Sequence, residues 1–259
     1  MARALNSAGR EVVGFDVDRA TSAGAMESGA LSRLADSALD LAGEVDLLCY
    51  AVPMDVAVGM LRDHMAVWRP DAVITDVSSM KRPVMAAARD LGVLDRFVGS
   101  HPMAGSHARG FGASTEDLFF GARIWLVADG ASAPARSKVE GLWERVGGGP
   151  EWIDAEGHDQ RMLLVSQVPQ LLSTILADLL DSRGLGEGDL GPGGRDMTRL
   201  AASSIDMWLP LLRSGGPDLA RALREFATRA DAVARAVEAA DDEALVELFR
   251  RAGLWRRGG

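Results

Sequence analysis

The segment EVDLLCYAVP, residues 44–53, contains an unbroken apolar run from Leu47 to Val52 and ends at a proline. A half-buried strand alternates apolar and polar residues, so this run predicts a strand that is buried on both faces. Further strands are predicted at 10–18, 71–79, 96–103, 122–129 and 151–155, with helices between them at 2–8, 20–41 (in pieces), 55–68, 82–91 and 134–147. This alternation predicts a doubly wound, Rossmann-like α/β domain with a parallel sheet.

Strand patterns stop near residue 155, and helical patterns continue to the end of the chain. Helices are predicted at 158–184, 195–216, 217–240 and 241–255, and Pro169 predicts a kink or break in the first of them. We therefore expect a dinucleotide-binding domain at 1–153 and a helical domain at 154–259. The Leu and Ala stripe across 217–250 is typical of core and a homodimer interface.

Composition excludes several classes of protein. The 259 residues carry a net charge of −9 without a basic stripe, which argues against a nucleic-acid partner. The single cysteine, Cys49, excludes a disulfide framework and a multi-cysteine metal site, and it suits a reducing cytoplasm. Charged residues or prolines interrupt the apolar stretches, and the start lacks a secretory apolar region, so we expect a cytoplasmic protein without a membrane span.

Asp16 follows the predicted strand EVVGF, where a dinucleotide fold places an acid that binds the adenosine ribose. A carboxylate there accepts hydrogen bonds from a 2′-hydroxyl and repels a 2′-phosphate, which favours NAD over NADP. A surface acid after a strand is the alternative.

The strand and G-x-G-x-x-G turn that normally precede this acid are not found in residues 1–15. Without that central strand, its two neighbours would face each other across a gap of about 10 Å, and their backbone groups would lack partners. Two interpretations stay open: the start of the chain is incomplete, or the chain is a degraded form.

Five motifs together resemble the prephenate dehydrogenase family, which includes arogenate and cyclohexadienyl dehydrogenases. They are TDVSSMK (75–81), GSHPMAGS (99–106), LFFGARIWL (118–126), GHDQ (157–160) and GGRDMTRLA (193–201). The resemblance implies an NAD-dependent, homodimeric enzyme of tyrosine biosynthesis. Its reaction is oxidative decarboxylation: C4 of a cyclohexadienol loses a hydride to NAD, the C4 hydroxyl loses its proton, and the ring carboxylate leaves as carbon dioxide.

The resemblance implies two catalytic residues. His101 matches the family's catalytic histidine, which acts as a base on the C4 hydroxyl; a capping or packed histidine is the alternative. Ser79 matches the serine that hydrogen-bonds this histidine and the substrate hydroxyl, and it also fits a cap of the next helix. The role of Lys81 stays open, with a solvated lysine at a helix start as one reading. No metal site is expected.

Binding residues follow from the same resemblance. Arg199 matches the arginine that pairs with a substrate carboxylate, with an interdomain salt bridge as the alternative. The cofactor would lie along Ala51, Val52 and Pro53 and near Ser78, contacted mainly through backbone groups.

Three positions depart from the family pattern. Gln167 and Gln170 stand where the family often has histidines facing the substrate, and His107 stands where it commonly has glutamate. We expect all three to contact the substrate, and a glutamine there can donate hydrogen bonds but carries no charge. Prephenate, arogenate and 4-amino-4-deoxyprephenate therefore all stay open as substrates.

The sequence also bears on two other classes of protein. A truncated, non-catalytic dimeric remnant stays open because of the missing glycine turn. Another two-domain β-hydroxyacid-type dehydrogenase is disfavoured, because that group relies on a lysine in its helical domain and residues 151–259 contain none.

Overall fold

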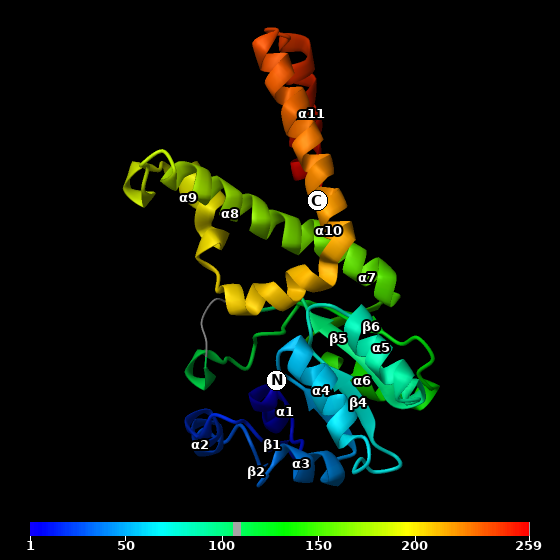
Figure 1. The fold of residues 1–259 in the computed structure, drawn as a ribbon. Helices are drawn as coiled ribbons and strands as arrows, with labels where there is room; N and C mark the ends of the chain where they lie inside the picture. The colour runs from blue at the N-terminus through cyan, green and yellow to red at the C-terminus, as the bar shows by residue number, and fades with distance from the viewer. Residues whose placement is uncertain (106–109, 259) are drawn as a thin grey trace.

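In the computed structural model, the described residues, 1–105 and 110–258, form a sheet-containing N-terminal part and a helical C-terminal part (Figure 1). The strands are β1 (Val13–Gly14), β2 (Arg33–Leu34), β3 (Leu47–Tyr50), β4 (Val73–Asp76), β5 (Phe97–Pro102), β6 (Arg123–Val127) and β7 (Gly149–Trp152). The helices of this first part are α1 (Ala2–Ser7), α2 (Arg19–Glu27), α3 (Ala38–Glu44), α4 (Met54–His64), α5 (Arg82–Asp90) and α6 (Ala133–Arg145). All of these except β2, which falls inside a predicted helical region, match predicted segments.

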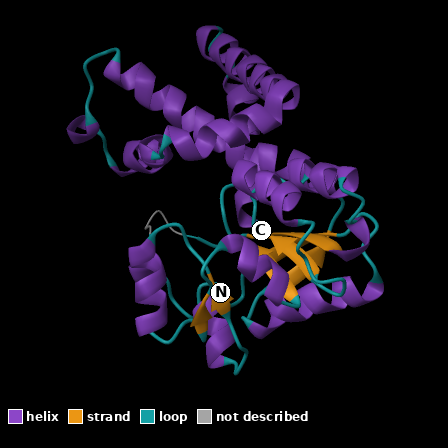
Figure 2. Cartoon of the chain, turned by 60° about the horizontal axis from the view of Figure 1, so that its bottom comes forward, coloured by secondary structure: helices purple, strands orange, loops and turns teal. Residues whose placement is uncertain are grey.

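The strands belong to two separate sheets. β1 pairs with β2, while the larger sheet has the order β3-β4-β5-β6-β7. Figure 2 shows the two groups of strands apart from each other. No ladder joins β1 to β3 in the described structure, in keeping with the expectation that these two strands lack a common neighbour.

The larger sheet is mixed, so the prediction of a parallel sheet was wrong at one step. β3, β4 and β5 run parallel, β6 runs antiparallel to β5, and β7 runs parallel to β6. A parallel neighbour requires a long crossover, usually a helix. The connection 103–122 has only the 3-10 turn Phe111–Ala113 among its described residues, so β6 returns antiparallel beside β5.

Apolar clusters cover both faces of the larger sheet. In β4, Val73 belongs to the cluster that includes α6, and Ile74 belongs to the cluster that includes α4 and α5. Successive side chains of a strand point to opposite faces, so both faces of β4 are buried. This double burial explains why the strands read as unbroken apolar runs in the sequence.

The second part consists of helices. They are α7 (Ala155–Met162), a π-helical turn (Leu163–Gln167), α8 (Val168–Asp181), α9 (Pro192–Thr198), α10 (Ile205–Glu238) and α11 (Asp242–Arg257), with 3-10 turns at Glu187–Asp189 and Arg199–Ala202. The break expected at Pro169 is replaced by the π turn immediately before it, which keeps α7 and α8 continuous. A kink lies instead at Gly216, whose φ of 42° departs from the helix.

Helices α8, α10 and α11 extend away from the larger sheet (Figure 1) and carry many exposed apolar side chains. Among the described residues, one continuous helix, Ala155–Asp181, is long and apolar enough to cross a membrane by length and composition. This contrasts with the expectation that no segment would meet that criterion. A single such helix is weak evidence for a span, because helices of protein cores meet the same criterion.

Trp143 provides a test of the core around α6. Its side chain is fully buried, its indole Nε1 donates to Ser100 Oγ over 2.9 Å, and its ring meets Phe119 edge-on at 5.3 Å. We expect Trp143→Ala to lower the free energy of unfolding by about 3–5 kcal/mol, measured by urea denaturation. The matched control is Phe120→Ala, because Phe120 is 82% exposed; it should cost about 0.5 kcal/mol or less. Equal losses in both variants would contradict this assignment of the core.

Candidate active site

Three parallel strands end at one edge of the larger sheet, and predicted site residues follow each of them. Ala51 follows β3, Ser78 and Ser79 follow β4, and His101 lies near the end of β5. Thr75 pairs with Val98, so Ser78 and His101 each come three residues after this paired position. Open α/β sheets bind ligands at the carboxyl ends of their strands, so these residues mark the candidate site.

A buried ion pair supports this edge. Lys81 Nζ donates to Asp76 Oδ1 over 2.8 Å and to Asp76 Oδ2 over 2.6 Å, and neither side chain is exposed. The same ammonium donates to the backbone oxygen of Ser100 over 2.5 Å. Burial lowers the pKa of Lys81, and the charge of Asp76 opposes this shift. Lys81 is therefore a structural cation, and the reading of a solvated lysine was wrong.

His101 lies beside a second histidine. Its Nδ1 is 2.9 Å from Nε2 of His158, and the two rings meet edge-on. Burial, the positive charge of Lys81 and the neighbouring His158 together lower the pKa of His101 to about 3. His101 is therefore neutral near pH 7, which is the form that accepts a proton.

In the described structure, neither of the two serines that follow β4 is hydrogen-bonded to His101. Ser79 is half-buried, and no hydrogen bond joins it to His101 in the described structure. Ser78 donates its backbone N–H to Asp76, and its buried Oγ has no partner among the described residues. The hydrogen-bonding partner of His101 is thus His158, and the role of Ser79 stays a prediction.

His158 and Asp159, at the start of the helical part, were not assigned roles from the sequence. His158 Nδ1 is 2.7 Å from Asp159 Oδ1, and both side chains are completely buried. Asp159 also accepts the backbone N–H groups of Lys81 and Arg82 at 2.7 and 2.9 Å. Burial alone would raise the pKa of Asp159, but the hydrogen bonds from His158 and from these two backbone groups outweigh it and lower that pKa. The GHDQ motif was the only sequence signal for this pair.

The two predicted substrate-side glutamines are buried between helices. Gln167 Nε2 contacts Met80 Sδ at 3.2 Å, and Gln170 Nε2 donates to the backbone oxygen of Leu200 over 2.8 Å. Their amide oxygens have no partner among the described residues. Gln167 thus contacts the segment that carries Ser78 and Ser79, and Gln170 contacts the turn that carries Arg199.

Arg199 is exposed, and within the described part of the chain it makes neither an ion pair nor a side-chain hydrogen bond. The alternative reading, an interdomain salt bridge of Arg199, is therefore not found. That contact is made instead by Arg82, which pairs with Glu156, Asp159 and Asp218 of the helical part. His107 lies outside the described residues.

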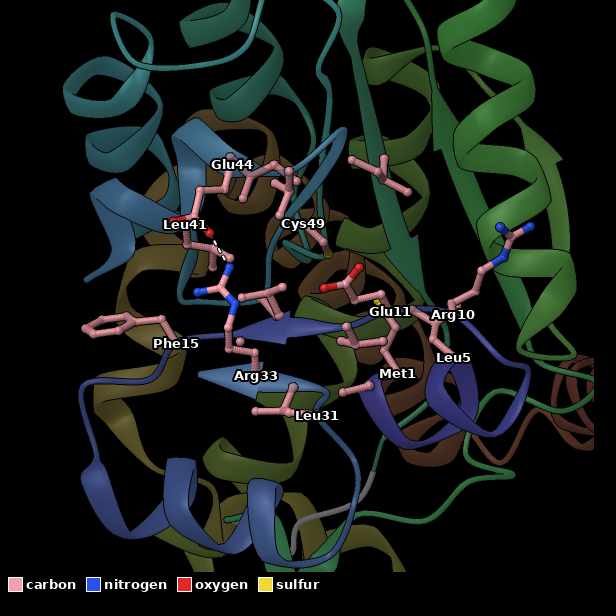
Figure 3. Close-up of a pocket in the computed structure, with 18 of the residues that line it drawn as sticks. Met1, Leu5, Arg10, Glu11, Phe15, Leu31, Arg33, Leu41, Glu44 and Cys49 are labelled. Carbon is pink, nitrogen blue, oxygen red and sulfur yellow. Dashed lines mark hydrogen bonds and ion pairs between the residues drawn. The ribbon is translucent and has the colours of Figure 1, made fainter. Parts of the chain in front are cut away.

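A cavity of about 1030 Å³ lies along the gap between the two sheets. Its lining includes Val13 and Gly14 of β1 on one side and Leu47, Leu48 and Cys49 of β3 on the other. Figure 3 shows labelled residues from α1, β2, α3 and β3 around it, together with Phe15, which directly follows β1. The cavity thus lies between the edge of β1 and the edge of β3.

Two of the predicted cofactor residues, Asp16 and Ala51, line this cavity, whereas Val52, Pro53 and Ser78 do not. Asp16 is exposed, and its Oδ1 accepts the backbone N–H of Asp18 over 2.8 Å. The placement fits an acid that receives a ribose at the carboxyl end of β1. The glycine-rich turn that would bind the cofactor's pyrophosphate is not found in residues 1–15. Their glycines, Gly9 and Gly14, do not form a G-x-G-x-x-G motif.

Two family models match the chain on either side of residue 150. Residues 1–149 match "prephenate dehydrogenase, nucleotide-binding domain", and residues 154–251 match "prephenate dehydrogenase, dimerization domain". The gap between the two matches contains the end of β7, and α7 begins at Ala155.

Individual relatives agree with these matches. Prephenate dehydrogenase of Bacillus subtilis is 27% identical, over 98% of this chain and 70% of that protein. Cyclohexadienyl dehydrogenase of Zymomonas mobilis is 28% identical, over 83% of this chain and 75% of that protein. Among solved structures, prephenate dehydrogenase from Aquifex aeolicus in complex with hydroxyphenyl propionate and NAD+ has a TM-score of 0.89 at 24% identity, covering 98% of this chain and 92% of that chain. This structural likeness shows that the two chains share a fold.

The low pKa of His101 predicts a pH-dependent stability. Between pH 6.5, its ordinary pKa, and its folded value of about 3, the unfolded chain binds a proton that the folded chain does not. Stability should therefore fall as pH is lowered through this window, by up to about 1.4 kcal/mol per pH unit from this residue. Urea denaturation at pH 7, 6 and 5 should show a steeper loss for the wild type than for His101→Asn. Parallel losses in the two proteins would show that His101 is not held neutral.

Proposed function

The chain belongs to the prephenate dehydrogenase family, and from this premise we propose that it oxidises prephenate to 4-hydroxyphenylpyruvate in tyrosine biosynthesis, with NAD as hydride acceptor. The hydroxyl proton of prephenate goes to a base, the hydride from C4 goes to NAD, and the ring carboxylate leaves as carbon dioxide. Loss of carbon dioxide leaves a phenolate, which takes a proton back at the former C4 oxygen, so the products are 4-hydroxyphenylpyruvate, NADH and carbon dioxide.

The observation that carries this proposal is the position of His101 at the carboxyl edge of three parallel strands, in contact with the buried His158. A base that is unprotonated at neutral pH accepts the hydroxyl proton as C4 loses its hydride. The buried Lys81, paired with Asp76, supports the same edge of the sheet. Ser79, half-buried after β4, is proposed to hydrogen-bond the substrate hydroxyl.

Asp16 supports NAD as the cofactor. Its exposed carboxylate at the end of β1 suits the two ribose hydroxyls, and its charge disfavours a 2′-phosphate. The structural neighbour from Aquifex aeolicus is described as a complex with NAD+. When bound, the cofactor supplies the hydride acceptor, while Ala51 and the following residues are proposed to flank it.

The substrate carboxylate is proposed to pair with Arg199, which is exposed and without a partner in the described structure. Gln167 and Gln170 are proposed to face the side chain of the substrate, where their buried amides offer neutral hydrogen bonds. Neutral groups suit either a pyruvyl or an amino-acid side chain, so arogenate is an alternative substrate. A further alternative is 4-amino-4-deoxyprephenate, which has an amino group at C4 in place of the hydroxyl. A homodimer through the helical part is proposed, since residues 154–251 match a dimerization domain and α10 and α11 expose apolar side chains.

A second candidate function follows from the split sheet. A cavity separates β1 from β3 at the position where a dinucleotide fold has a central strand. The second candidate is therefore that these 259 residues, taken by themselves, form a dimer that binds no dinucleotide. Titration of the 259-residue chain with NADH, followed by fluorescence, separates the two candidates: saturable binding supports the enzyme, and no binding supports the non-catalytic dimer.

Activity is tested by NADH formation with prephenate, arogenate and 4-amino-4-deoxyprephenate in parallel. We expect turnover of prephenate, and we expect His101→Asn to lower kcat by about 100-fold or more with a smaller change in KM. A folded, NADH-binding protein that turns over none of the three substrates would overturn the proposed activity. An unchanged kcat in His101→Asn would contradict only the proposal that His101 is the base, and not the proposed activity.

Substrate binding by Arg199 is tested with Arg199→Lys. The lysine keeps the charge but loses the planar fork, so we expect KM to rise about 10-fold while kcat changes little. Arg195→Lys is the matched control, because Arg195 is an exposed arginine of the preceding helix α9. Equal effects of the two substitutions would argue that neither arginine is specific for the substrate.

A further inference from the structure

Three side chains form a chain of hydrogen bonds that crosses from the sheet to the helical part. His101 Nδ1 lies 2.9 Å from His158 Nε2, and His158 Nδ1 lies 2.7 Å from Asp159 Oδ1. His101 belongs to β5, whereas His158 and Asp159 belong to α7. Both of the α7 side chains are completely buried, so water does not compete for these bonds.

The direction of each hydrogen bond follows from the last member of the chain. The ionised carboxylate of Asp159 only accepts, so His158 Nδ1 carries the proton and donates to it. With the proton of His158 on Nδ1, its Nε2 is the atom left to accept, and it accepts from Nδ1–H of His101. The remaining nitrogen of His101, Nε2, is left with a lone pair.

We propose that His158 and Asp159 are positioning residues that hold His101 in its Nδ1–H tautomer, so that Nε2 is the atom that accepts the substrate proton. The catalytic use of this arrangement rests on the proposed function. When Nε2 takes up the hydroxyl proton, Nδ1–H stays bonded to His158, and the new positive charge is stabilised through the chain that ends at the Asp159 carboxylate.

The same carboxylate ties the arrangement to the contact between the two parts of the chain. Asp159 accepts the backbone N–H groups of Lys81 and Arg82 at the start of α5, at 2.7 and 2.9 Å. The position of the Asp159 carboxylate thus depends on how α7 packs against the start of α5. The tautomer of the base therefore depends on how the helical part docks against the sheet-containing part.

The tautomer is measured directly by nuclear magnetic resonance of the full chain labelled with ¹⁵N-histidine. The sequence contains four histidines, so the signals are assigned with single variants. We expect the wild type at pH 7.5 to show His101 protonated at Nδ1 and unprotonated at Nε2. The reverse tautomer, with Nε2 protonated, would overturn the proposal whatever the activity of the protein.

Two variants of His158 separate positioning from folding. His158→Phe removes the acceptor, and we expect the Nδ1–H form of His101 to lose its predominance and kcat to fall about 10- to 100-fold at nearly unchanged KM. His158→Gln keeps an amide oxygen that accepts from Nδ1–H, so it should recover much of both signals. An unchanged kcat in His158→Phe would overturn the positioning role.

The contribution of Asp159 is tested with Asp159→Asn, for which we expect a fall in kcat of about 10-fold or more. The matched control is Glu156→Gln, because Glu156 lies on the same helix and also contacts Arg82, at 3.2 Å, but is not part of the chain. Equal falls in kcat in the two variants would mean that the contact of Arg82 with α7, and not the hydrogen bond from His158 to Asp159, determines the activity. If the tautomer is as expected but no substrate is turned over, the proposed function fails while the positioning of His101 stands.

Discussion

The candidate site depends on one buried ion pair, between Lys81 and Asp76. Two charges completely removed from water are tolerated only when further hydrogen bonds satisfy them, and here these bonds come from the chain around the site. Asp76 accepts the backbone N–H groups of Ser78 and Ser100, and Lys81 Nζ donates to the Ser100 oxygen. The pair thereby joins the end of β4, the end of β5 and the start of α5 into one rigid unit.

This ion pair also affects the electrostatics of His101. A fixed positive charge from Lys81, added to burial, keeps His101 neutral, while the carboxylate of Asp159 orients it through His158. The cation and the anion therefore act on the same imidazole in different ways. The charge of Lys81 lowers the pKa of His101 and so disfavours its protonated form. The carboxylate of Asp159 fixes the orientation of the His101 ring through His158.

The helical part contributes as much to the site as the sheet does. Asp159 binds the start of α5, Gln167 contacts Met80, and Arg82 reaches three acids of the helical part. The π turn before Pro169 contains Gln167, and a β-carbon added at Gly215 would approach its amide oxygen to 2.4 Å. A side chain at position 215 would therefore require the Gln167 amide to move.

The sequence by itself predicted the alternation of strands and helices, the change to an all-helical part near residue 155, and the grouping of His101 with residues after β3 and β4. The first two features follow from local periodicity. The grouping of His101 with Ser79 and with residues 51–53 came from the resemblance to the family, and the place of His101 at the carboxyl edge followed from the general rule for open α/β sheets. The antiparallel β6, the π turn, the burial of Lys81 and the partnership of His101 with His158 were decided only by the tertiary structure. The physical reason is distance along the chain: His101 and His158 are 57 positions apart, and no local pattern encodes a hydrogen bond between residues that meet only when α7 docks on α5.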